Sequence, residues 1–92
     1  LALAQGAIEG PRNSAYSVQG DPALQPTEVS DNGRFTLLRF ASAQALPAVF
    51  TVSEDGSERA AAYDVRGDAI VVHGVARVLR LRRGRTVLCL FN

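Results

Sequence analysis

Residues 31–52 read DNGRFTLLRFASAQALPAVFTV, and this stretch decides the fold class. Its opening DNG favours a tight turn, because Asn and Gly tolerate positive φ and Asp can hydrogen-bond back to the chain. Residues 34–40 carry large apolar side chains on both alternating faces, which favours a central strand covered on two sides. Pro47 cannot donate to a ladder and marks the start of a second apolar strand that runs to Val52.

The residues before this stretch divide into a tail and the start of a domain. Residues 1–14 are rich in Ala, Gly and other small side chains and show no clean periodicity, so we interpret them as a flexible linker or tail. A short helix over residues 1–8 is the alternative. Residues 15–92 then form one domain, because a chain of 92 residues is too short for two cores.

Short strands separated by turn residues fill the rest of the domain. The strands expected around the central pair are residues 15–18, 27–30, 59–65, 69–73, 75–82 and 85–91. Gly20 ends the first of them, and Asp21 caps a single helical turn. Turn signals recur about every 8–12 residues, a spacing typical of sandwiches. The sequence therefore predicts an all-β fold: a small antiparallel β-sandwich of about eight short strands, with at most one short helical turn.

The composition supplies no catalytic or metal-binding set. The net charge of +1 gives no general attraction to nucleic acid or membranes. His73 and Cys89 are the only histidine and cysteine, too few for a zinc site, and no spacing pairs a nucleophile with a base. The tripeptide at 66–68, RGD, has a sufficient local role as a turn. No stretch reaches the roughly 20 apolar residues of a membrane span. We therefore expect no enzymatic activity, no metal and no cofactor.

Cys89 lies in the apolar final strand. A buried thiol in such a strand is expected to be inert. The alternative is an intermolecular disulfide, because a single cysteine cannot pair within its own chain.

Arginines concentrate in the last two expected strands, and residues 69–92 contain no acidic side chain. A basic two-stranded ribbon can bind phosphates, so contact with nucleic acid through Arg80 and Arg82 is an alternative function. The ribbon lacks the interleaved aromatic residues that stack on single strands. We favour a solvated face or a secondary protein contact, in which Arg80 and Arg82 pair with carboxylates of other strands or subunits.

The first short strand is the expected exposed edge of the sandwich. Tyr16, Ser17 and Val18 follow the tail and precede Gly20, and such a terminal strand covers a sheet edge poorly. An extended peptide can add to such an edge through main-chain hydrogen bonds, with alternate side chains filling pockets. We therefore predict that Tyr16, Ser17 and Val18 bind a partner.

The segments DNGRFTLLRF, ALPAVFTVSEDGSE, YDVRGDAIVVHGVARVLRLRRG and VLCLFN follow one another in an order that resembles the C-terminal domain of the TrbG/CagX family. The resemblance covers about residues 13–92. Residues that match the family pattern sit at turns, strand cores and the end of the chain: Gly33, Phe35, Phe40, Pro47, Gly56, Gly74, Gly84 and Asn92. The chain departs from the pattern at Leu38, where relatives commonly have an aromatic residue, and in the small apolar loop at 41–45.

The family contains the ninth VirB protein, a subunit of the outer-membrane core complex of type IV secretion. The resemblance implies a β-sandwich that binds a short, largely disordered segment of a small outer-membrane lipoprotein, the seventh VirB protein. It also implies contact with the channel-forming tenth VirB protein and a ring of copies. The expected location is the periplasm, at the outer membrane of a Gram-negative bacterium. The edge at residues 16–18 is then the expected lipoprotein site.

Overall fold

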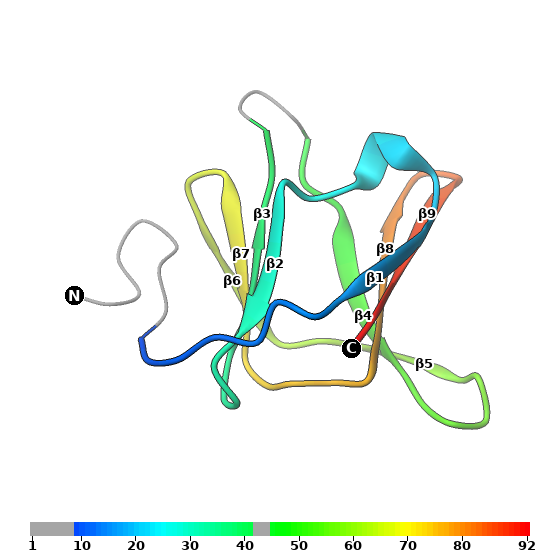
Figure 1. The fold of residues 1–92 in the computed structure, drawn as a ribbon. Helices are drawn as coiled ribbons and strands as arrows, with labels where there is room; N and C mark the ends of the chain where they lie inside the picture. Colours follow the sequence, from blue (N-terminus) through cyan, green and yellow to red (C-terminus); the bar gives the residue numbers. More distant parts are fainter. Residues whose placement is uncertain (1–8, 42–44) are drawn as a thin grey trace.

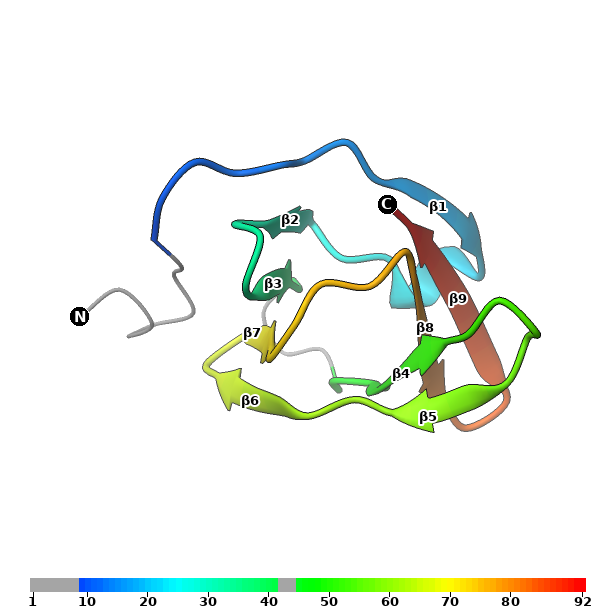
Figure 2. The ribbon, with the colours of Figure 1, turned by 90° about the horizontal axis from the view of Figure 1, so that it is seen from below.

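The structure is a computed structural model that describes residues 9–41 and 45–92. Within these residues, nine strands form two antiparallel sheets that face each other (Figures 1 and 2). The five-stranded sheet has the order β1 (Ser17–Gly20), β9 (Thr86–Phe91), β8 (Val78–Arg83), β4 (Ala48–Val52) and β5 (Glu58–Ala60). The four-stranded sheet has the order β2 (Glu28–Asp31), β3 (Thr36–Arg39), β7 (Ala69–Val72) and β6 (Tyr63–Arg66). The predicted all-β sandwich is confirmed.

The main core lies between the two sheets. It contains the inward residues of the central strands: Leu38, Phe40, Val49, Ile70, Val72, Leu79, Leu81, Leu88 and Leu90. Leu24 joins them from η2 (Pro22–Leu24), a short 3₁₀ turn. The side chain of Asp21 accepts a hydrogen bond of 2.9 Å from the N–H of Ala23, so the expected cap and single helical turn are confirmed.

The central strand predicted from residues 34–40 is β3, which pairs with β2 on one side and β7 on the other. Leu37 and Leu38 point to opposite faces of this strand, and both are 0% exposed. Leu38 belongs to the core between the sheets, whereas Leu37 joins Ala69 and Val71 in a second, smaller cluster. The prediction of a strand covered on two sides is confirmed.

Three predicted strands differ from the structure. The strand expected over residues 59–65 is two strands, β5 and β6, that belong to different sheets. Ala61 lies between them, donates its N–H to the Val49 carbonyl at 3.0 Å and packs against the core as the chain crosses over. The strand expected from residue 75 begins three residues later, at Val78.

The first strand, expected at 15–18, is Ser17–Gly20 instead, and Gly20 lies inside it. Gly20 lies inside because a residue without a side chain lets the chain approach β9 closely. The alternative helix over residues 1–8 and most of the loop at 41–45 lie outside the described residues. The boundary between tail and domain therefore stays a prediction.

Two connections run along opposite open sides of the sandwich. Residues 9–20 pass along one side, from the edge of β2 to the edge of β9, and the β5–β6 segment passes along the other (Figure 2). Each sheet therefore ends in a short strand on each side. These four edge strands (β1, β5, β2 and β6) are the positions at which another chain could add to the sheets.

Gly20 offers a direct test of how β1 docks. Its φ is +137°, and a Cβ at this position would lie 2.7 Å from both the Leu88 Cα and the Val87 carbonyl oxygen. We expect Gly20→Ala to lower the free energy of unfolding by about 2–4 kcal/mol, because it combines strain with a backbone clash. Urea unfolding measures this loss, and amide hydrogen exchange should show faster exchange in residues 17–20.

Gly56→Ala is the matched control. Gly56 has a φ of +87°, but a Cβ there would meet nothing within 4 Å, so only the strain of the positive φ remains. We expect a loss of about 1 kcal/mol and unchanged exchange in β1. Equal losses for the two variants would show that the close approach of β1 to β9 contributes nothing.

Candidate protein-binding site at the β1 edge

The hydrogen-bond pattern shows which main-chain groups of β1 face outward. Asp21 donates its N–H to the Val87 carbonyl at 3.0 Å, and the register pairs Gln19 with Cys89. Hydrogen-bonded and non-bonded pairs alternate along an antiparallel ladder, so alternate residues point away from β9. The N–H and C=O groups of Val18 and Gly20 therefore face away from the sheet, which is the arrangement that an added strand requires.

The predicted binding residues lie at or next to this edge. Ser17 and Val18 are in β1 and are exposed, and the side chain of Val18 is 37% exposed. Tyr16 precedes the strand, and its side chain packs against the main core. The structure thus brings the three residues together, although only Ser17 and Val18 present side chains to solvent.

Tyr16 is held by Asp31, a residue of β2 in the opposite sheet. The Tyr16 hydroxyl donates to Asp31 Oδ2 at 2.6 Å. Burial, and then the Asp31 carboxylate, raise the pKa of Tyr16 well above its ordinary value of 10.0. Burial alone would raise the pKa of Asp31, but hydrogen bonds from Tyr16, Asn13 and Gly33 lower it instead. The contact therefore positions the strand.

Asn13 fixes the segment before Tyr16. Its main chain exchanges two hydrogen bonds with Asp31, of 2.8 and 3.0 Å, and so extends the edge of the four-stranded sheet. Its side-chain amide donates to Asp31 Oδ2 at 3.1 Å and to Asn92 Oδ1 at 2.8 Å. Asn13 and Asp31 were not singled out as functional residues from the sequence. Their pairing is non-local, and no short pattern signals it.

The basic ribbon predicted at residues 77–85 is partly neutralised. Glu58 of β5 accepts from Arg80 Nη1 at 2.5 Å and from Arg82 Nε at 3.0 Å, and Arg82 Nη2 also donates to it. Hydrogen bonds from Arg82 and then Arg80 lower the pKa of Glu58 to about 2. Sequence analysis placed Glu58 only beside a turn, but the register carries it over β4 to the arginines of β8.

Cys89 lies next to this cluster as a free, half-buried thiol. Arg80 Nε donates to Cys89 Sγ at 3.4 Å. The choice between an inert thiol and an intermolecular disulfide stays a prediction.

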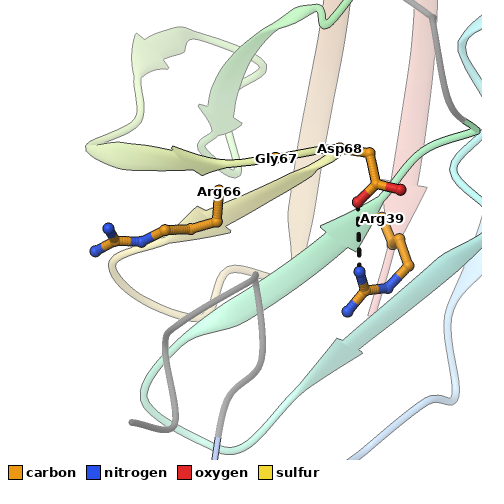
Figure 3. A pocket seen from close by; sticks show the side chains of 4 residues that line it. All are labelled: Arg39, Arg66, Gly67 and Asp68. Atoms are coloured by element: carbon orange, nitrogen blue, oxygen red, sulfur yellow. Dashed lines mark hydrogen bonds and ion pairs between the residues drawn. The ribbon is translucent and has the colours of Figure 1, made fainter.

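An open hollow of about 550 Å³ is lined by Arg39, Arg66, Gly67 and Asp68 (Figure 3). Arg39 and Asp68 point toward each other and pair at 3.4 Å, whereas Arg66 extends away from them. Residues 66–68 connect β6 to β7, which is the turn predicted from the sequence. The hollow contains an ion pair and no set of nucleophile and base.

His73 also forms a simple pair. Its Nε2 lies 2.8 Å from Asp64 Oδ2, and its ring meets Phe35 edge-on at 6.0 Å. No cluster of three or more potential metal ligands occurs among residues 9–41 and 45–92. In the same part of the chain, no helix has the length and apolar character needed to cross a bilayer.

The described residues thus define an all-β module whose distinctive surfaces are strand edges and arginine clusters. A profile of the CagX family, described as conjugal transfer proteins, matches residues 3–92. The chain belongs to the CagX family, as its sequence pattern predicts.

The relatives in this family are named as components of type IV secretion systems. The chain is 43% identical over 83 residues to the type IV secretion system protein virB9 of Bartonella henselae, which covers 90% of this chain and 29% of the relative. It is 38% identical over 97 residues to protein virB9 of Agrobacterium fabrum, covering 97% and 33%. It is 37% identical over 86 residues to PtlF of Bordetella pertussis, covering 90% and 32%. The chain thus spans about a third of the length of these relatives.

Tyr16→Phe tests the link between the sheets. Loss of the hydroxyl should lower the free energy of unfolding by about 1–2 kcal/mol near pH 7. The raised pKa of Tyr16 means that the unfolded state loses the phenolic proton first, so this stabilising contribution is full below pH 10 and falls as the pH rises further. Chemical unfolding of both proteins from pH 7 to 11 should show a difference that shrinks above pH 10. A constant difference would contradict the assigned role.

Glu58→Gln tests the carboxylate that joins β5 to β8. The lowered pKa means that the ion cluster stabilises the protein above the ordinary value of 4.5, and that this contribution is lost as the pH falls toward about 2. The wild type should therefore exceed the variant in stability at pH 6, and the two should converge near pH 2. Glu54→Gln, at the neighbouring turn, is the control and should match the wild type. An NMR titration of the Glu58 carboxyl with a midpoint near 4.5 would contradict the assignment.

Proposed function

We propose that this β-sandwich is a non-catalytic binding module of a type IV secretion core complex. It binds a short, extended segment of a small outer-membrane lipoprotein, of the seventh VirB type, by strand addition to β1. The binding tethers a periplasmic ring of copies to the outer membrane of a Gram-negative bacterium. Contact with a channel-forming subunit of the tenth VirB type completes the assembly.

The observation that carries this proposal is the outward direction of the Val18 and Gly20 main-chain groups. An incoming strand can pair with these groups without displacing any hydrogen bond between β1 and β9. The exposed Val18 side chain supplies an apolar contact beside them. A disordered lipoprotein segment would order on binding, and the bound peptide would stabilise the sandwich by mass action.

Tyr16 and Ser17 have supporting roles in this proposal. The bond from Tyr16 to Asp31 holds the start of β1 in place, so the edge is formed before a peptide arrives. Preorganisation of this kind reduces the ordering cost of binding. Ser17 follows directly, and its exposed side chain lies on the face opposite to that of Val18.

The nucleic-acid alternative has less support. Arg80 and Arg82, on which it depends, share the carboxylate of Glu58, which lowers the charge available to phosphates. Arg80 and Arg82 enter the proposal as a secondary protein contact.

Val18→Pro tests strand addition directly. The Val18 N–H points away from β9, so its removal leaves the β1–β9 ladder intact but takes a donor from the incoming strand. We expect at least an order of magnitude weaker binding of the N-terminal lipoprotein peptide, since one lost bond and the proline ring both oppose pairing. An NMR titration of the domain with this peptide gives the affinity and the shifted amides.

Val65→Pro is the matched control. Val65 also lies in an edge strand, is 54% exposed, and points its main chain outward, because the neighbouring bonded pair is Ala62 with His73. It belongs to β6, on the opposite side of the sandwich, and should bind the peptide like the wild type. Equal binding by wild type and Val18→Pro, or a loss only in Val65→Pro, would refute addition at β1.

A further inference from the structure

The outer face of the five-stranded sheet is unusually apolar for a surface layer. In the three central strands, the side chains that point away from the core include Phe50, Val52, Val78, Val87, Cys89 and Phe91, and each of them is only partly buried. We call these six residues, with Arg80 and Arg82 among them, the outer sheet face. In the part of the chain that the structure describes, the five-stranded sheet is an outermost layer (Figure 2). A contiguous apolar surface of this kind marks an interaction site.

The charged residues of this face limit what can cover it. Arg80 and Arg82 both donate to Glu58, so two guanidinium groups share one carboxylate. The side chains of Arg80, Arg82 and Glu58 remain 25%, 41% and 22% exposed. The cluster therefore carries one excess positive charge, surrounded by apolar side chains.

An apolar partner alone is a poor match for this face. Covering it would remove water from an excess guanidinium charge without replacing the lost hydrogen bonds, and burial of an unpaired charge is strongly unfavourable. A partner that brings one carboxylate beside Arg82 would complete a cluster of two cations and two anions. Arg82 is the more exposed of the two arginines, so it has donor groups accessible to a second carboxylate.

From this charge complementarity, we propose that the outer sheet face docks a segment of a partner protein in which apolar side chains surround one Asp or Glu, and that this carboxylate pairs with Arg82. The site is distinct from the β1 edge, where the peptide of the proposed function adds. The two sites therefore depend on different residues and can be tested separately.

Cys89 reports whether the face is covered. It is the only cysteine in these 92 residues and lies within the outer sheet face, so alkylation of its thiol by iodoacetamide measures access. We expect alkylation, quantified by peptide mass spectrometry, to be at least tenfold slower in the full-length protein within its assembled secretion complex than in the purified full-length protein alone. Equal rates would overturn the proposal.

A zero-length cross-link identifies the partner carboxylate. The sequence contains no lysine, so Arg82→Lys introduces one amine at the site and keeps the positive charge. Carbodiimide activates a nearby carboxylate, the amine displaces the urea, and an amide bond forms between the two proteins. The Glu58→Gln background removes the nearby intramolecular carboxylate. Arg85→Lys, in the β8–β9 turn outside the face, is the matched control.

We expect the Arg82→Lys protein to cross-link to an acidic residue of a different protein, with no such product from Arg85→Lys. Arg82→Glu should raise Cys89 alkylation in the assembled complex to the free rate, while Val18→Pro should leave it slow. A cross-link to a second copy of this chain, or equal products from both lysine variants, would overturn the proposal. Circular dichroism checks that each variant is folded, and Arg82→Ala replaces Arg82→Glu if the latter is not.

Discussion

Asp31 joins the two sheets on the side where β1 lies. Its main chain bonds to Asn13, and its carboxylate accepts from the side chains of Tyr16 and Asn13 and from the N–H of Gly33. These contacts hold the segment that leaves one sheet at Asn13 and enters the other at Ser17. The position of β1, and with it the exposed edge, depends on this one buried carboxylate.

A second carboxylate, Glu58, has a comparable role on the outer surface. It ties β5 to β8 across the intervening β4 and leaves Arg82 half exposed. The two carboxylates differ in environment. Asp31 is 5% exposed and bonds to neutral donors, whereas Glu58 faces solvent and pairs with cations. The first therefore supports the architecture, and the second shapes a surface on which a partner can dock.

Local patterns predicted several elements well. The alternation in residues 34–40 placed Leu37 and Leu38 on opposite faces, and both are buried. Alternation in the last strand likewise placed Leu88 and Leu90 in the core. The same reasoning was wrong where the chain changes sheets: residues 59–65 have one uninterrupted β-prone pattern, yet Ala61 marks a crossing between sheets. A side-chain pattern reports which face is buried and carries no signal for the sheet that a strand joins.

The sequence by itself determined the fold class, most of the turns and the family, because each depends on residues close together or on their linear order. The Asp21 cap is one such feature. Only the tertiary structure decided that Tyr16 bonds to Asp31, that Gly20 must approach β9, and that Glu58 neutralises Arg80 and Arg82. These contacts join residues from different strands. They follow from sheet order and register, which the packing of the whole core selects.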